Sequence, residues 1–253
     1  MSLPDLRARD RTAVELMDDP DCDLPALERT YAQFRAVNAV VAGWQLAYRR
    51  HVRPLLRDDR VTTILDVGCG GGDLARALAR WARRDGRRAQ VTGIDPDPRA
   101  HAWAARQPPV PGVAFRCAHS SDLVAEGRRF DIVVSNHVLH HLDEHALRTL
   151  LDDSRALARA RVAHSDIARG AWAYRLFSLG TLPLATGSFV REDGLTSIRR
   201  SYTPAELAAA AGPGWRVERP WPARNLLLDD GLPGEALPGE TLPGEAPAGD
   251  GPR

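Results

Sequence analysis

The residues best suited to chemistry in this chain form a glycine-rich segment between an apolar run and an amphipathic one. The segment reads Asp66-Val67-Gly68-Cys69-Gly70-Gly71-Gly72. Glycines let the backbone turn tightly and approach a ligand where any Cβ would intrude. The free amides and the dipole of a following helix N-terminus also favour a polar ligand. The segment therefore predicts a loop that binds a nucleotide-type cofactor.

A second acidic residue follows the glycine-rich segment by about one helix and one strand. Val91-Thr92-Gly93-Ile94 is an apolar strand pattern that ends on Asp95 and Pro96. In cofactor-binding α/β folds, a carboxylate at this place accepts hydrogen bonds from ribose hydroxyls. We therefore expect Asp95 to contact a ribose.

The glycine spacing leaves two cofactors open. Gly68 and Gly70 satisfy the first half of the dinucleotide pattern G-x-G-x-x-G, so a nicotinamide dehydrogenase remains possible on this evidence, but the third position falls on Asp73. An acidic residue followed by G-x-G-G-G instead resembles the first motif of class I S-adenosylmethionine-dependent methyltransferases. The segment from Phe130 to Leu142 is similar to the fourth strand of methyltransferases that act on quinones, phenols and related small molecules. The resemblance covers roughly residues 61–228.

The resemblance implies S-adenosylmethionine as the cofactor and a role for each motif. Asp66 and the glycine-loop backbone would face its methionine moiety, Asp95 the ribose, and Pro96 or a neighbour the adenine. Related enzymes often hold the adenine amino group with an Asp after the third strand; here Asp122 is assigned that contact, with His119 or Ser120 as alternatives. The full expected cofactor set is Asp66, Gly68, Cys69, Gly70, Gly72, Asp95, Pro96, Asp122 and Asn136.

Adjacent histidines supply a candidate base. Methyl transfer from a sulfonium needs alignment of the acceptor, and a hydroxyl acceptor also benefits from proton removal near neutral pH, which suits His. His140 and His141 follow the fourth strand and are the expected catalytic residues. The alternative is that one of them caps a helix or packs beside the cofactor while the other faces solvent. His137 is interpreted as an edge residue whose hydrogen bonds are satisfied.

In the methyltransferases that this sequence resembles, an insertion at this place forms a substrate lid, so the long insertion at residues 168–201 is the candidate lid. Loops of this length are usually functional, and its aromatic content suggests an apolar acceptor. We expect acceptor contacts from Asp166, Arg169, Trp172 and Phe177. Arg191, Arg199 and Arg200 either pair with an acidic group on the acceptor or are solvated surface charges.

The elements that position these residues alternate between strand and helix. Strands are predicted near 62–67, 89–95, 112–117, 130–135 and 160–166, and helices near 72–84, 97–107 and 144–158. This order predicts an α/β fold with a Rossmann-like doubly wound sheet. A capping box at Thr203-Pro204-Ala205-Glu206 opens a further helix that Gly212 closes. By resemblance, the last two strands, near 215–219 and 224–228, complete a seven-stranded, mostly parallel sheet whose last strand is antiparallel.

Three regions are expected along the chain. Apolar residues repeat at helical spacing from Leu27 to Leu55, which predicts one long helix within an N-terminal extension at 1–57; it either covers the sheet or lies over the cofactor. The methyltransferase domain is expected at 58–228. A five-residue Leu-Pro-Gly-Glu repeat follows, and its composition predicts a disordered tail at 229–253.

Composition excludes several classes of function. A net charge of +1 over 253 residues argues against a nucleic-acid partner. Three cysteines without C-x-x-C spacing fit a reducing cytoplasm, and no metal ligand set is expected. No signal peptide or membrane-spanning run is predicted. The oligomeric state is left open.

The sequence thus favours a cytoplasmic enzyme that transfers a methyl group to a small lipophilic acceptor, phenolic or polyketide-like, with O-methylation preferred. C-methylation of a quinone-like ring is the first alternative. A non-catalytic cofactor-binding protein or an oxidoreductase is the second.

Overall fold

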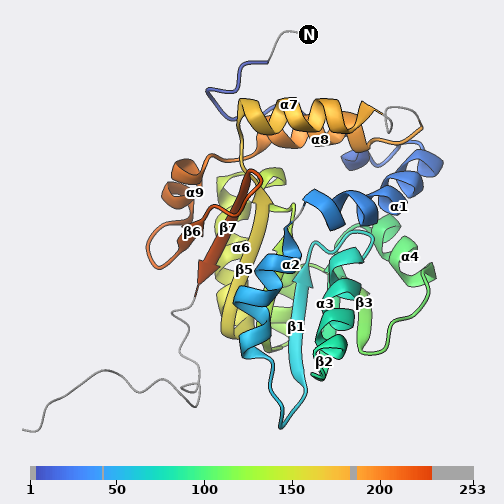
Figure 1. Ribbon diagram of the computed structural model, residues 1–253, viewed down its shortest axis with the longest axis vertical. Helices are drawn as coiled ribbons and strands as arrows, with labels where there is room; N and C mark the ends of the chain where they lie inside the picture. Colours follow the sequence, from blue (N-terminus) through green and yellow to red (C-terminus); the bar gives the residue numbers. More distant parts are fainter. Residues whose placement is uncertain (1–3, 42, 183–186, 230–253) are drawn as a thin grey trace, which may run out of the picture.

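A single sheet forms the centre of the computed structural model, which describes residues 4–41, 43–182 and 187–229. The strands are β1 (Thr62–Val67), β2 (Ala89–Asp95), β3 (Val113–Cys117), β4 (Phe130–Asn136), β5 (Ala158–Ile167), β6 (Arg216–Glu218) and β7 (Arg224–Asp229). Their order is β3-β2-β1-β4-β5-β7-β6, and β7 is antiparallel to both of its neighbours (Figure 1). The predicted seven-stranded, mostly parallel sheet is confirmed.

Helices cover both faces of the sheet. They are α1 (Leu24–Val41), α2 (Trp44–Ala47), α3 (Asp73–Arg84), α4 (Pro98–Arg106), α5 (Ser120–Ala125), α6 (Glu144–Leu157), α7 (Ala171–Gly180), α8 (Val190–Arg200) and α9 (Pro204–Ala211). Short 3₁₀ or π turns form η1 (Leu16–Asp18), η2 (Tyr48–Val52), η3 (Arg53–Leu55) and η4 (Leu139–His141). None of the helices described in this structure is long and apolar enough to cross a bilayer.

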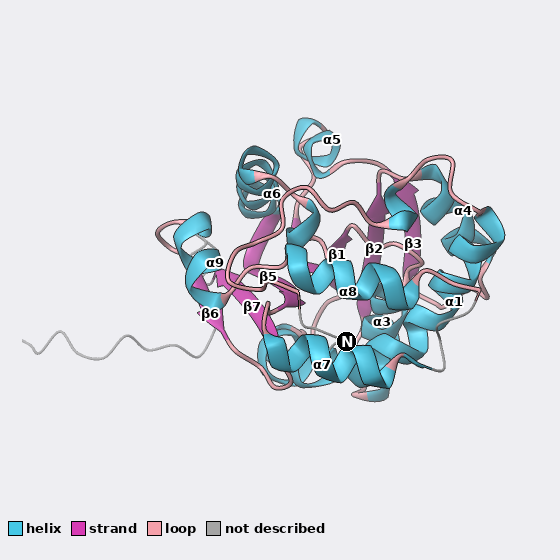
Figure 2. Cartoon of the chain, turned by 90° about the horizontal axis from the view of Figure 1, so that it is seen from above, coloured by secondary structure: helices cyan, strands magenta, loops and turns pink. Residues whose placement is uncertain are grey.

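The alternation of side chains along β1 explains the two hydrophobic layers. Ile64 packs with α2 and α3 on one face, whereas Leu65 packs with α5, α6 and α9 on the other. Figure 2 shows α3 on one side of the sheet and α5 and α6 on the opposite side. Because both faces are covered, β1 and β4 are buried almost throughout, as central parallel strands are.

The N-terminal helical prediction is wrong in one respect. The apolar spacing from Leu27 to Leu55 predicted one helix, but α1 ends at Val41 and α2 begins at Trp44. Gly43 lies between them in the left-handed region, with φ of 62°, which a helix does not tolerate. A turn at this place redirects the chain, so that Tyr31 packs near Trp103 of α4 while Trp44 joins the layer under β1.

The insertion at 168–201 contains two helices, α7 and α8, which the sequence left unassigned. They lie side by side above the carboxyl edge of the sheet (Figures 1 and 2). After them, the Thr203 hydroxyl and the Glu206 carboxylate form the predicted capping box of α9, and Gly212 ends the helix. The predicted tail, apart from Asp229 in β7, lies outside the described residues.

Candidate active site

The carboxyl ends of β1, β2 and β4 open into a cavity of about 860 Å³. We call one wall the glycine-loop side; it is formed by Asp66, Gly68, Cys69, Gly70, Gly71, Asp73, Asp95, Pro96 and Asp97. We call the opposite wall the lid side; it is formed by Glu15, Asp18, His140, His141, Ala173, Leu176, Phe177, Gly180, Thr181, Val190, Asp193, Gly194, Ser197 and Ile198. Tyr31 and Phe34 of α1 also line the cavity, so the N-terminal helix lies over the site.

Glycine is required in the loop because of both conformation and space. Gly68 and Gly70 have φ of 64° and 51°, and a Cβ on Gly68 would lie 2.6 Å from Val138 Cγ2. Gly72 has φ of 76°, but its missing side chain leaves room for Phe115, not for the cavity. The sequence assigned Gly72 to the cofactor, whereas its local role is to let the chain enter α3.

Asp66 is a buried carboxylate whose charge nothing in the described structure compensates. Neither oxygen has a hydrogen-bond partner among the described residues, although the side chain lines the cavity. Burial raises the pKa of Asp66 well above its usual value, and the charges of Asp73 and Asp95 raise it further. The Ala75 amide lowers this pKa but is not in hydrogen-bonding geometry. A cationic or donor group in the cavity would satisfy this carboxylate.

Asp95 ends β2 with its carboxylate at the cavity, as the sequence predicted. Its Oδ2 accepts from the Gly70 amide at 2.8 Å, and its Oδ1 accepts from the Asp97 amide at 2.9 Å. Burial raises its pKa, while the same two amides lower it. Each oxygen keeps further acceptor capacity, so the carboxylate can take two hydroxyl donors from a diol.

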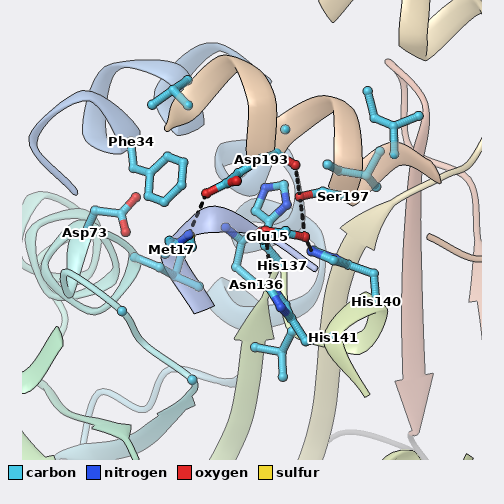
Figure 3. Close-up of a pocket in the computed structure, with 18 of the residues that line it drawn as sticks. Glu15, Met17, Phe34, Asp73, Asn136, His137, His140, His141, Asp193 and Ser197 are labelled. Carbon is cyan, nitrogen blue, oxygen red and sulfur yellow. Dashed lines mark hydrogen bonds and ion pairs between the residues drawn. The ribbon is translucent and has the colours of Figure 1, made fainter. Parts of the chain in front are cut away.

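His140 is a buried cation between the carboxylates of Glu15 and Asp166, and Figure 3 shows it beside Glu15. Its Nδ1 lies 2.7 Å from Asp166 Oδ1, and its Nε2 lies 3.3 Å from Glu15 Oε1. Burial alone would lower the pKa of His140, but Asp166 and Glu15 raise it to about 9. The ring is therefore protonated at neutral pH and has no lone pair with which to accept a proton.

His141 is placed differently, although it is adjacent in sequence. Its side chain is 27% exposed and its Nδ1 lies 3.1 Å from Asp18 Oδ2. This carboxylate orients the ring, leaving Nε2 on the side of Glu15, whose Oε2 is 3.8 Å away. Of the two predicted catalytic histidines, His141 has the geometry of an oriented base.

On the lid side, a second buried carboxylate holds the N-terminal segment. Asp193 of α8 accepts from the amides of Leu16 and Met17 at 2.7 and 3.0 Å. Ser197, one turn later, donates to Glu15 at 2.9 Å. Burial raises the pKa of Asp193 to about 7, the two amides lower it, and the charges of Glu15 and Asp18 raise it. These contacts fix Glu15 against His140.

Arg224 bridges the ends of β4 and β7. Its guanidinium donates to His137 Nε2 at 2.9 Å and to Asn136 Oδ1 at 2.7 Å. Burial and this cation lower the pKa of His137 well below its usual value. His137 is thus a neutral hydrogen-bonded residue, as the sequence suggested, and Asn136 lines the cavity with its amide oriented by Arg224.

Five of the predicted site residues do not line the cavity: Gly72, Asp122, Asp166, Arg169 and Trp172. Asp122 accepts from the His119 amide at 2.8 Å and caps α5. Arg169 is buried and bonds to Ser201 O and Glu206 Oε1, at 2.7 and 2.6 Å. Trp172 is 61% exposed. Asp166 is not in the cavity wall but holds His140, whereas Phe177 does line the cavity.

Sequence reasoning missed Glu15, Asp18, Asp193 and Ser197. None of them belongs to a recognisable motif, and each has a partner far along the chain: Glu15 and Ser197 are 182 positions apart. The sequence left open whether Arg191 contacts the acceptor. In the structure, Arg191 instead donates to Ser178 and Thr181 at the end of α7.

Two overlapping sets of side chains bring metal-ligand atoms within 4.8 Å of one another: Glu15, His140 and His141, and His137, His140 and Asp166. His140 belongs to both sets, and its protonated ring already lies as a cation between the carboxylates of Glu15 and Asp166. The absence of a metal stays a prediction.

Comparison with known proteins supports the motif interpretation. Residues 64–161 match a family model described as a methyltransferase domain. The chain is 38% identical over 108 residues to a ubiquinone biosynthesis O-methyltransferase of Methylobacterium sp. (strain 4-46), covering 40% of this chain and 39% of that protein. It is 30% identical over 181 residues to a mitochondrial one of Arabidopsis thaliana, covering 66% and 52%. The matches thus span about half or less of these relatives' lengths.

A solved structure gives the same fold. Human N-acetylserotonin methyltransferase, in complex with S-adenosylmethionine, superposes with a TM-score of 0.58 at 12% identity, covering 81% of this chain and 56% of that chain. The resemblance to class I S-adenosylmethionine-dependent methyltransferases, predicted from the glycine loop and the fourth strand, is confirmed.

Proposed function

We propose that this protein transfers a methyl group from S-adenosylmethionine to a hydroxyl oxygen of a small lipophilic acceptor of phenolic or polyketide-like type. The observation that carries the proposal is the pair of carboxylates on the glycine-loop side of the cavity, of which Asp66 is buried and Asp95 is half-buried. A cofactor with an ammonium group, a sulfonium and a ribose diol matches both.

The chain's own residues would bind this cofactor along the carboxyl edge of the sheet. Asp66 takes the ammonium group, the amides of the glycine loop take the carboxylate, and Asp95 takes the ribose hydroxyls. Pro96 or a neighbour contacts the adenine, and Asn136 lies where β4 meets the cofactor. The sulfonium supplies an activated methyl group, and the protein's task is alignment and exclusion of water, which together contribute up to about 7–11 kcal/mol.

His141 is the proposed base for the acceptor hydroxyl. Asp18 holds Nδ1, which leaves Nε2 to accept the proton of a phenol. Bound S-adenosylmethionine would supply the methyl group to the phenol oxygen and leave as S-adenosylhomocysteine. His140 acts as a positioning residue, because its positive charge holds Glu15 and Asp166 in place. A quinone-like ring methylated at carbon is the competing acceptor; the names of the two curated relatives favour oxygen.

The charge of the glycine-loop side argues against a nicotinamide cofactor. Asp73 stands at the first position of α3, where a dinucleotide would place its pyrophosphate. Asp66, Asp95 and Asp97 line the same wall. Four carboxylates repel a pyrophosphate and attract a sulfonium compound.

The lid side favours an apolar acceptor, because Leu176, Phe177, Val190 and Ile198 line it. A cytoplasmic location and the absence of a nucleic-acid partner remain predictions; the three cysteines are free thiols, which fits a reducing compartment.

The test is calorimetric titration of the full chain with S-adenosylhomocysteine and, in parallel, with NAD. We expect micromolar binding of the first and none of the second. A transfer assay with methyl-labelled S-adenosylmethionine and simple alkylphenols then detects the ether product. Binding of NAD alone, or of neither compound, would overturn the proposal.

A further inference from the structure

Phe177 of α7 and Gly194 of α8 face each other in an unusually close contact. An ideal Cβ built on Gly194 would lie 2.2 Å from Phe177 Cζ and 2.3 Å from Cε1. Both residues line the cavity. The ring of Phe177 thus lies against the backbone of α8 at the one turn where α8 carries no side chain.

Backbone conformation does not explain a glycine at this place. Gly194 lies inside α8, among helical residues, and is not one of the glycines with positive φ. Glycine in a helix interior is unfavourable relative to alanine. The contact with the Phe177 ring is therefore the physical reason for glycine at position 194.

The two helices are tied together beside this contact, so they hold a defined spacing. Arg191 of α8 donates to Thr181 Oγ1 at 3.1 Å and to Ser178 Oγ at 3.3 Å. Asp193 anchors the same helix to the Leu16 and Met17 amides. Because α8 is held from both sides, a group added at position 194 displaces the Phe177 ring more readily than it separates the helices.

The space beside the ring is apolar. We call it the lid chamber; its walls are Ala173, Leu176, Phe177, Val190, Gly194 and Ile198. No charged residue belongs to this set. Asp193 and Ser197 of α8 also line the cavity, but their side chains are bonded to the η1 amides and to Glu15, and His141 lies at η4. A ligand with a hydroxyl end and a hydrocarbon end matches this separation.

We infer that the lid chamber binds the hydrocarbon substituent of a phenolic acceptor, and that the Phe177 ring, lodged in the notch at Gly194, sets how large a substituent enters. This inference rests on the proposed function for the identity of the acceptor. It assigns size selection to a single pair of residues on α7 and α8.

Binding of 4-alkylphenols with increasing chain length to the full chain tests the inference, measured by calorimetry in the presence of S-adenosylhomocysteine. Phe177→Ala opens the chamber and shifts the best chain length upward, with a gain of roughly tenfold in affinity for the longest phenols. Gly194→Ala pushes the ring into the chamber and shifts the best chain length downward by a similar factor.

The double variant separates the ring contact from any effect on the helix. With Phe177 already replaced by Ala, Gly194→Ala has no ring to displace, so the double variant should match Phe177→Ala alone. Gly170→Ala is the matched control: it precedes α7, a Cβ there meets nothing within 4 Å, and the profile should stay unchanged. Melting temperatures check that each variant folds.

Two outcomes would overturn the inference. One is an equal effect of Gly194→Ala with and without the Phe177 ring, which would place its cause in the helix backbone. The other is a failure of every alkylphenol to bind while S-adenosylhomocysteine binds normally. Failure of the unaltered protein to bind S-adenosylhomocysteine would instead count against the proposed function.

Discussion

The two walls of the cavity are built from residues at very different distances along the chain. On the glycine-loop side, the hydrogen bond from Gly70 to Asp95 joins residues 25 positions apart, one in the loop after β1 and the other at the end of the neighbouring β2. On the lid side, the bond from Leu16 to Asp193 spans 177 positions. The first wall is a local consequence of strand–loop–helix units, whereas the second forms only after the whole chain has folded.

The two walls also differ in whether their acidic side chains have partners within the protein. Asp66 has no hydrogen-bond partner in its wall and burial raises its pKa, so a cationic ligand would stabilise its ionised form. Glu15, by contrast, already has His140 and Ser197, and His140 also has Asp166. The lid side thus holds the N-terminal segment in place, and the difference in pairing fits the proposal that the glycine-loop side binds a cationic cofactor.

Loss of the proposed base should have the largest effect. If His141 takes the acceptor proton as proposed, His141→Ala should lower kcat by roughly 10²–10⁴-fold, the usual range for general base catalysis. Affinity for S-adenosylhomocysteine should not change, because the glycine-loop side is intact. The exposed His145→Ala variant serves as the control. Unaltered kcat in His141→Ala would exclude His141 as the base.

Breaking the charge cluster should reduce stability. Glu15→Ala leaves His140 with one carboxylate partner, and loss of one member of a buried ion pair costs about 3–5 kcal/mol of unfolding free energy. Denaturant titration at pH 7 measures the change. Glu28→Ala removes an exposed carboxylate that pairs with Arg106, so it should change stability little. Equal losses in both variants would mean that the buried pair of Glu15 and His140 contributes no more to stability than an exposed ion pair.

Stability should also decline on the alkaline side. An unfolded histidine titrates near 6.5, and the pKa of His140 is about 9 in the folded protein. Between these values only the folded state holds the proton, so its stabilising contribution is complete below about pH 6.5 and disappears as pH rises through 9, a change of about 3 kcal/mol. Urea titrations at several pH values measure the slope. A His140→Gln variant with the same slope as the unaltered protein would contradict the assignment.

The glycine-loop side can be tested with two aspartates that the sequence assigned to one cofactor. Asp95→Ala should weaken S-adenosylhomocysteine binding by roughly 10- to 100-fold, since hydrogen bonds to a charged group contribute about 1.5–3 kcal/mol. Asp122→Ala should leave this affinity unchanged, because Asp122 caps α5 outside the cavity. Calorimetry distinguishes them, and the reverse result would restore the sequence assignment.

The smallest effect is expected at Trp172. Its side chain is largely exposed, so Trp172→Ala should change alkylphenol affinity by less than about 0.5 kcal/mol, the usual limit for surface substitutions. Phe177, five residues later, lines the cavity. A large loss of affinity in Trp172→Ala would mean that the lid side extends over the outer face of α7.

The sequence by itself determined the parts that depend on short stretches of chain. The glycine loop, Asp66, Asp95 and the capping box of α9 follow from local conformation and the alternation of strands and helices, and the structure has them where they were predicted. The same reasoning selected His140 and His141 together, because adjacent histidines look alike in a sequence.

Only the tertiary structure decided how those two histidines differ. Burial between Glu15 and Asp166 makes His140 a fixed cation, whereas His141 meets Asp18 at the edge of the cavity. It also turned Asp122, Arg169 and Trp172 away from the cavity and brought Asp193 into it. Protonation and orientation depend on charges that arrive from distant segments, and no local pattern in the sequence encodes those distances.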